Sequence, residues 1–247
     1  MKKILLILLI FCPLIDCLAQ KKLLIYTKNG NGYVHTNIQA SVEALTKLCK
    51  EAGYLTEVSN DPAVFTPDKL KTFSCVIFSN TNNEGFDNDT QRQAFTDYIH
   101  NGGSFVGIHS ASGSERKWPW YWALLGGKFV RHPPLQKFTM KVIDPNHPST
   151  KFLKDTWQWE DECYYTDNLN PDIHVLLAVD LTTINDEKKT EYPGSTFGNY
   201  FPLAWCHEFE GGRQFYTSLG HKEEYYKDPV FLQHLLGGIQ WAMKVKK

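Results

Sequence analysis

The sequence predicts an α/β fold in which a mostly parallel β-sheet lies between helices and is extended by additional antiparallel strands. Two observations predict it. Between residues 22 and 113, short apolar runs alternate with amphipathic segments, which is typical of right-handed βαβ units. From residue 137 onward, strand-like runs follow one another with few helices between them. We therefore expect a single domain over residues 20–247, doubly wound in its first half.

The first half contains four predicted strands, at residues 22–27, 54–59, 75–80 and 104–108. A helix is predicted over residues 34–53, because apolar side chains recur at helical spacing and Gly53 provides a stop signal. A second helix, over residues 87–103, starts with capping residues and places Phe95, Tyr98 and Ile99 on one face. These elements would cover both faces of a parallel sheet.

The second half contains four further predicted strands, at residues 137–143, 174–180, 201–209 and 213–219. The last two are separated by the sequence EGG, which predicts a hairpin turn. A closing helix is predicted over residues 228–244, with Pro229 near its start and a largely apolar surface.

Residues 1–19 have the layout of a secretory signal: Lys2 and Lys3, an apolar run over residues 4–15, and small residues before a cleavage site after Ala19. The run is too short to span a bilayer comfortably, so we expect no stable membrane association after cleavage. The expected location is periplasmic or extracellular. Lipid attachment at Cys17 is the alternative, although Asp16 is a poor neighbour for lipoprotein cleavage.

The composition narrows the classes of function. The chain is 42% hydrophobic and 21% charged with a net charge of −1, so it predicts a globular protein and no electrostatic attraction to nucleic acid. Cys49 and Cys75 fall on predicted core faces and are interpreted as buried thiols. The sequence does not decide whether Cys163 and Cys206 form a disulfide. It contains no C-x-x-C pair that would support a zinc ribbon.

Polar side chains stand where the predicted parallel strands end. His35 follows the first strand, Asn80 and Glu84 the third, and His109 directly closes the fourth. Because ligands of open α/β sheets bind at the carboxyl ends of the strands, these residues are candidate site residues. A helix cap or a surface position is the simpler interpretation of His35 taken alone.

The second half adds a carboxylate and two imidazoles. Glu162 lies among aromatic residues in the stretch WEDECYY, where it is either a catalytic group of raised pKa or part of a solvated acidic edge. His221 follows a strand and a small residue, as His109 does, and His207 is a weaker candidate.

We therefore expect His35, His109, Glu162 and His221 to converge as the catalytic group. Three imidazoles suit a divalent metal such as zinc, and the tentative ligands are His35, His109 and His221. Metal-free acid–base chemistry on a polyol is the alternative, since no H-E-x-x-H motif is present. Aromatic faces beside polar groups suit a sugar. The candidate substrate-binding residues are Asn80, Glu84, Trp118, Trp120, Tyr164, Trp205, His207 and Arg213.

The chain from about residue 22 onward resembles the ThuA-like (trehalose utilisation) family, within the class I glutamine amidotransferase-like superfamily. The matching segments are Val34-His35, FVGIHSAS at 105–112, LLGGKFVRHP at 124–133, DPNHPST, WEDECYY, PLAW, GGRQFYTSLGH and the closing DPVFLQHLLGGIQWA. The resemblance implies a flavodoxin-like three-layer sandwich. Relatives that hydrolyse glutamine carry a nucleophilic cysteine at the strand-to-helix elbow, where this chain has His109, so glutaminase activity is not expected.

The resemblance also implies a role in carbohydrate catabolism, on a disaccharide or a 3-keto-glycoside. Removal of the acidic C2 proton needs a base, for which His109 or Glu162 is expected, with His221 or His35 as the acid. A metal or Arg213 would polarise the carbonyl. Two alternatives stay open: a non-catalytic carbohydrate-binding protein, and a metal-dependent hydrolase. The sequence does not determine the oligomeric state, and a homo-oligomer is compatible with it.

Overall fold

The structure, a computed structural model, describes residues 20–188 and 198–245. The predicted signal segment, residues 1–19, lies outside the described residues. One nine-stranded sheet runs through the molecule in the order β2-β1-β3-β4-β11-β10-β9-β6-β7. Its strands are β1 (Lys22–Tyr26), β2 (Leu55–Ser59), β3 (Cys75–Ser79), β4 (Ser104–Ile108), β6 (Gln136–Val142), β7 (Thr156–Asp161), β9 (His174–Asp180), β10 (Tyr200–Phe209) and β11 (Gly212–Thr217).

The sheet has two parts. Strands β2, β1, β3, β4 and β11 are parallel and form what we call the parallel half. Strands β10, β9, β6 and β7 pair antiparallel and form the antiparallel half. The order 2-1-3-4 followed by a fifth parallel strand is that of flavodoxin-like folds, which confirms the predicted fold class.

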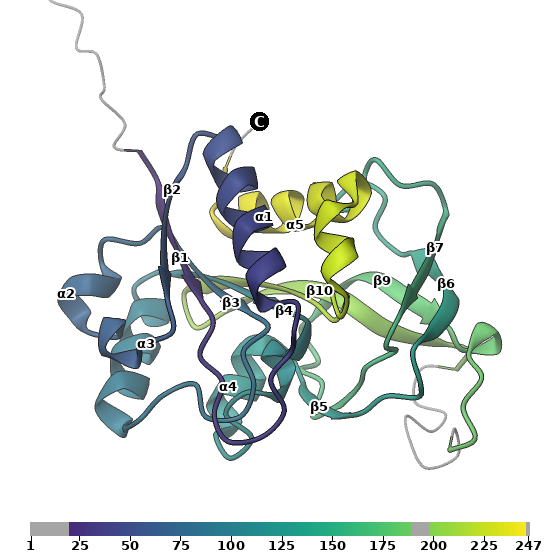
Figure 1. The fold of residues 1–247 in the computed structure, drawn as a ribbon, viewed down its shortest axis with the longest axis horizontal. Helices are drawn as coiled ribbons and strands as arrows, with labels where there is room; N and C mark the ends of the chain where they lie inside the picture. Colours follow the sequence, from purple (N-terminus) through teal and green to yellow (C-terminus); the bar gives the residue numbers. More distant parts are fainter. Residues whose placement is uncertain (1–19, 189–197, 246–247) are drawn as a thin grey trace, which may run out of the picture.

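Helices cover both faces of the parallel half (Figure 1). On one face lie α1 (Ile38–Glu51) and α5 (Pro229–Ala242), and on the other lie α3 (Asp89–His100) and α4 (Pro119–Leu125), with the short α2 (Pro67–Leu70) beside α3. Successive residues of β1 separate the two cores: Leu23 and Ile25 pack with the first pair of helices, Leu24 and Tyr26 with the second. This alternation produces the three layers.

The predicted elements match closely, with one shift at the first helix. Helix α1 begins at Ile38, so His35 lies in the preceding loop, and the buried face of the helix consists of Ser41, Leu45 and Cys49. The predicted hairpin joins β10 and β11. The sequence did not predict α2, strand β7 or the small antiparallel sheet of β5 (Lys128–Arg131) and β8 (Tyr165–Asp167).

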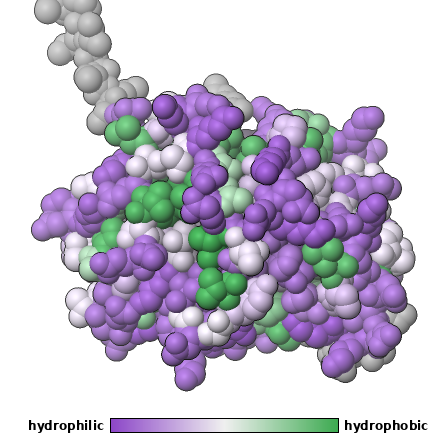
Figure 2. Space-filling view, viewed as in Figure 1, coloured by the Kyte–Doolittle hydropathy of each residue, from purple (hydrophilic) through white to green (hydrophobic). Residues whose placement is uncertain are grey.

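Two further expectations concern the cysteines and the surface. The four cysteines of the described residues, Cys49, Cys75, Cys163 and Cys206, are free and buried, so Cys163 and Cys206 form no disulfide. Within the described residues, no helix has the length and apolar character needed to cross a membrane. Figure 2 shows a mostly hydrophilic face on which apolar side chains gather in separate patches.

Candidate functional site

A cleft of about 370 Å³ opens at the carboxyl ends of the parallel strands. The loops that follow β1, β3 and β4 meet there, as expected for an open α/β sheet. Loops after β5, β7 and β11 complete the walls. The lining residues are Tyr33, His35, Asn82, Ser110, Gly113, Arg116, Phe129, His132, Glu162, Tyr164 and His221.

His109 lies directly beneath the cleft, in contact with the lining residues His35, Glu162 and Tyr164, and has a strained backbone conformation. It is fully buried and is the first residue after β4, with a φ of 51°. Non-glycine residues rarely adopt this left-handed region, and the strain is found mostly where a side chain has to be aimed at a functional site. The position is the sharp strand-to-helix turn predicted by the family resemblance, occupied by an imidazole.

The four predicted catalytic residues converge. One ligand atom from each of His35, His109, Glu162 and His221 can be chosen so that all four lie within 4.8 Å of one another. The Nε2 atoms of His109 and His35 are 3.2 Å apart. Oε2 of Glu162 lies 3.1 Å from Nδ1 of His221 and 3.7 Å from Nε2 of His109.

The tautomer of His109 is fixed by its partner on the far side of the ring. Nδ1 lies 2.7 Å from the carbonyl oxygen of Ser218 and donates to it, so the neutral ring presents a lone pair on Nε2. The Tyr164 hydroxyl and Nε2 of His35 both approach that lone pair, at 3.0 and 3.2 Å. One lone pair cannot serve two donors well, and His35 Nδ1 has no partner among the described residues.

The electrostatics of the cluster favour neutral imidazoles beside an ionised carboxylate. Burial, reinforced by the neighbouring imidazoles, lowers the pKa of His109 well below its usual range and that of His35 to about 4. Burial alone would raise the pKa of Glu162, but the imidazoles of His221 and His132 outweigh it and lower the pKa. The contact with Glu162 raises the pKa of His221.

Asp161 links Glu162 to the backbone segment that carries His221. Its fully buried carboxylate accepts hydrogen bonds from the backbone N–H groups of Glu162 (2.8 Å), Gly220 (2.8 Å) and His221 (3.3 Å). The indole of Trp159 donates a fourth, at 3.1 Å. Asp161 therefore fixes Glu162 and His221 relative to each other.

This donor set fits a divalent metal ion. A tetrahedral ion with bonds of about 2.0–2.1 Å holds its ligand atoms about 3.3 Å apart; three of the pairs here lie 3.1–3.7 Å apart, and all four atoms lie within 4.8 Å of one another. The Ser218 carbonyl orients His109 as outer partners orient metal-bound histidines. A cation would also accept a lone pair from Nε2 of His109 and another from Nε2 of His35. His35 would then no longer compete with Tyr164 for the lone pair of His109.

Tyr164 is the predicted substrate-binding residue that lines the cleft. Glu84 lies nearby but is exposed, and its carboxylate accepts from the backbone N–H of Asn31. Asn80 was expected at the rim, but it is fully buried and its side-chain amide bonds Asn37 and Tyr226. The position of Asn80 directly after β3 was predicted correctly, but its side chain is buried instead of pointing to the rim.

The other predicted substrate-binding residues lie away from the cleft. Trp118 and Trp120 are partly buried and pack against the core beside α3, where Trp118 stacks on Trp120 and meets the ring of Phe86 edge to face. The ring nitrogens of buried Trp205 and His207 are bonded to the carbonyls of α4. Arg213 pairs with Ser104 at the opposite end of the sheet and stacks on Trp241.

Seven lining residues were not among the predicted site residues: Tyr33, Asn82, Ser110, Gly113, Arg116, Phe129 and His132. His132 lies 3.5 Å from Oε1 of Glu162, and Arg116 lies over the Phe129 ring. The segment LLGGKFVRHP contains both residues: Phe129 lies within the short strand β5, and His132 directly follows that strand. Arg116 had no such positional signal, because it follows no strand.

Comparisons with known proteins agree with this geometry. The family model described as trehalose utilisation (ThuA) matches residues 22–242. The chain is similar to the solved structure of a putative ThuA-like protein from Bacteroides uniformis, with 26% identity, a TM-score of 0.70 and coverage of 92% of this chain and 93% of that one. A putative ThuA-like protein from Parabacteroides merdae has 20% identity, a TM-score of 0.70 and 92% coverage of both chains, which shows the fold alone.

A β-galactosidase from Bacillus circulans shares the fold at 12% identity and a TM-score of 0.56, with 92% of this chain matching 31% of that one. The comparison with curated proteins gave no match. The family model spans nearly all of the described residues. The chain belongs to the ThuA (trehalose utilisation) family.

Proposed function

We propose that this protein is an exported enzyme of carbohydrate catabolism that acts on a 3-keto-glycoside or a related disaccharide with the help of a divalent metal ion such as zinc. One observation carries the proposal: three imidazoles and a carboxylate converge within 4.8 Å at the floor of a cleft lined by aromatic rings. Burying ionisable groups side by side is costly, and a protein that only bound sugar would not need it.

In this proposal His35, His109 and His221 hold the ion, and Glu162 is its neighbour or fourth ligand. The ion supplies a Lewis acid that polarises a substrate carbonyl. Arg213, the alternative polarising group, lies too far away. Arg116 is the guanidinium that lines the cleft.

The carboxylate and the remaining imidazole have complementary roles. Glu162, whose pKa is lowered, takes the proton from C2 of a 3-keto-glycoside, and the C–H electron pair passes toward the C3 oxygen. That pair then forms the C1–C2 double bond as the C1–O bond breaks. The leaving oxygen takes a proton from His132, which borders the cleft and is not one of the three metal ligands. The products are an alcohol and an unsaturated 3-keto sugar.

The site also argues against glutamine hydrolysis. Acyl transfer needs a thiolate at the elbow, where this chain has a buried neutral imidazole. The Nδ1–H group of His109 is held by the Ser218 carbonyl, and its Nε2 faces Nε2 of His35. This arrangement suits a metal ligand better than a nucleophile that attacks an amide.

The test combines metal analysis with turnover of 3-keto-trehalose. We expect about one divalent ion per chain in protein purified without chelator. His109→Ala should remove it and lower turnover at least about 100-fold, the usual contribution of a positioned catalytic group. His174→Ala is the matched control, since His174 is exposed and bonds Asp144 away from the cleft. Unchanged turnover by His109→Ala would overturn the proposal.

A metal-dependent hydrolase is the second candidate, favoured by the same near-tetrahedral donor set. It predicts that an unoxidised disaccharide is cleaved and that chelator abolishes the cleavage. Mass spectrometry of the products separates the two reactions: water is incorporated in hydrolysis and absent from the unsaturated keto sugar. Trehalose binding without turnover of either sugar would indicate a non-catalytic binding protein instead.

A further inference from the structure

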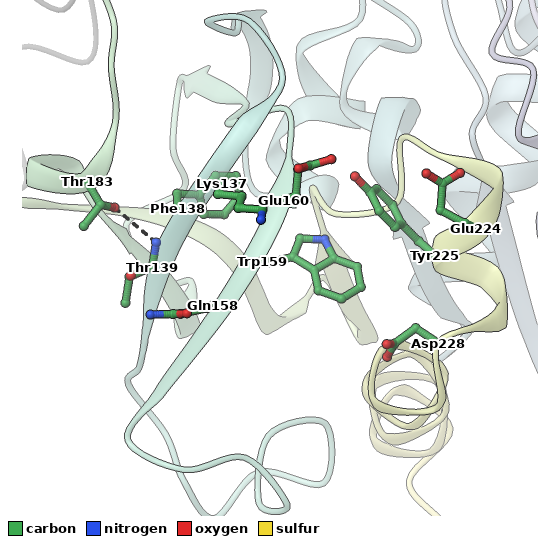
Figure 3. Close-up of a pocket in the computed structure, with 10 residues that line it drawn as sticks. All are labelled: Lys137, Phe138, Thr139, Gln158, Trp159, Glu160, Thr183, Glu224, Tyr225 and Asp228. Atoms are coloured by element: carbon green, nitrogen blue, oxygen red, sulfur yellow. Dashed lines mark hydrogen bonds between the residues drawn. The ribbon is translucent and has the colours of Figure 1, made fainter.

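A second cavity, of about 590 Å³, lies at the edge of the antiparallel half (Figure 3). It is bounded by β6 and β7 on one side and by the 3-10 turn Glu223–Lys227 and the start of α5 on the other. We propose that this cavity binds a neutral sugar unit, the distal part of a disaccharide whose reacting unit occupies the cleft. The inference rests on the proposed function for the identity of the sugar.

The base of the cavity is aromatic. The rings of Trp159 and Tyr225 lie 4.9 Å apart at an interplanar angle of 51°, and Phe138 is buried next to them. Trp159 is partly exposed and presents a flat apolar face at the cavity. Such faces stack on the C–H faces of pyranose rings, whose hydroxyls point to the sides.

The walls provide the polar partners that a sugar needs. Glu160, Glu224 and Asp228 supply acceptors, and Lys137 and Gln158 supply donors. Glu160 forms an ion pair with Lys222 at 2.5 Å. The carboxylates carry three negative charges, and the ammonium groups of Lys137 and of Lys222, the partner of Glu160, carry two positive ones. The net charge of −1 favours a neutral polyol over an anionic ligand.

One side chain points directly to a missing partner. The Tyr225 side chain is 7% exposed, and its hydroxyl makes no hydrogen bond with any described residue. Figure 3 shows that hydroxyl directed toward the side of the cavity where Glu160 lies. Buried hydroxyls nearly always form hydrogen bonds, so a ligand hydroxyl that bonded Tyr225 would remove the free-energy cost of leaving this group unpaired.

The cavity and the cleft are neighbours along the same strand. Glu160 lines the cavity, and Glu162, two residues further on, lines the cleft. Two residues of an antiparallel strand span about 6.8 Å, the scale of one sugar unit. On the opposite wall, Lys222 pairs with Glu160 and directly follows His221, so a disaccharide in the cleft would extend across this ion pair.

Tyr225→Phe tests the inference with little disturbance of the fold, because the hydroxyl it removes has no protein partner. We expect unchanged or raised thermal stability, a KM for 3-keto-trehalose raised about fivefold, as for one lost hydrogen bond, and an unchanged KM for methyl 3-keto-α-glucoside. Tyr226→Phe is the structural control: its hydroxyl bonds Asn80 at 2.9 Å, so this variant should lose thermal stability.

A binding measurement separates this inference from the enzyme proposal. Saturation-transfer NMR with trehalose is expected to detect binding to the wild type and to His109→Ala, and about fivefold weaker binding to Tyr225→Phe. Weaker trehalose binding without turnover of either keto sugar would retain the sugar site and overturn the enzyme. Equal trehalose affinity in wild type and Tyr225→Phe would overturn the sugar site, as would the absence of trehalose binding to the wild type. Binding of a peptide along the free edge of β7 in place of the sugar would also overturn it.

Discussion

The parallel and antiparallel halves of the sheet contribute different chemistry to the cleft. The parallel half supplies His35, His109 and His221, which follow β1, β4 and β11. The antiparallel half supplies Glu162 at the end of β7, and the small sheet beside it supplies Tyr164 and His132. Topology brings the three imidazoles to one edge, whereas the carboxylate reaches it only because the sheet extends and turns back over that edge.

The halves also differ in how their groups are charged. Burial keeps His35 and His109 neutral, as metal ligands must be, by lowering their pKa. The imidazoles of His221 and His132 lower the pKa of Glu162 and favour its ionised form. We infer that one half is built to hold a cation and the other to move a proton.

The largest expected effect comes from separating these two tasks. His35→Ala should abolish both metal binding and turnover. Glu162→Gln should retain most of the metal and still lower kcat at least about 100-fold, since it removes the base and leaves three ligands. Metal content by elemental analysis and kcat with 3-keto-trehalose check this. Glu208→Gln, an exposed carboxylate of β10, is the control. If Glu162→Gln lost the metal completely, the division between the halves would be wrong.

The next effect concerns the junction between the halves. Asp161→Asn places an amide NH₂ against backbone N–H donors that now bond a carboxylate, so we expect a loss of about 1–3 kcal/mol in the free energy of unfolding. Misplacement of His221 should lower kcat as well. Urea denaturation and steady-state kinetics measure the two effects. Asp180→Asn, an exposed cap at the end of β9, should cost about 1 kcal/mol or less and leave kcat unchanged. Equal effects in both variants would argue against a positioning role.

The effect expected to be smallest at neutral pH is a pH dependence of stability that comes from His234, a buried residue of α5. Burial lowers the pKa of His234 to about 4, from about 6.5 in the unfolded chain. Between these values the unfolded state binds the extra proton, so stability falls as the pH decreases from 6.5 toward 4, by at most about 3 kcal/mol.

His234→Asn provides the comparison for this pH effect. The asparagine amide can replace the Nδ1–H donor that bonds the Ser149 carbonyl at 2.9 Å, but it does not titrate in this range. Denaturation midpoints at pH 7 and pH 4.5 should therefore differ less in the variant than in the wild type. His147, whose pKa burial also lowers to about 4, would leave a residual slope. An identical pH slope in variant and wild type would show that His234 is already charged in the folded protein.

The prediction that three imidazoles and Glu162 converge was correct, whereas most of the predicted substrate-binding residues lie away from the cleft, and this difference has a physical reason. His35, His109 and His221 were found because a polar residue directly after a parallel strand has its place set by topology. Residue type alone was the reason for predicting Trp118, Trp120 and Trp205. The type of a residue does not determine whether its side chain points into the cleft or into the core. Large aromatic rings near a cleft are drawn into the core whenever helices offer enough apolar area.

The sequence by itself determined the class of fold, the order of most strands and helices, and which imidazoles end at one edge of the sheet. These follow from hydrophobic periodicity and from the single handedness of βαβ crossovers. Only the tertiary structure decided that Arg116 and His132 enter the cleft, that Arg213 lies at the opposite end, and that Asp161 holds the two halves together. Those outcomes depend on long-range packing and hydrogen bonding between segments far apart in the chain, which no local pattern encodes.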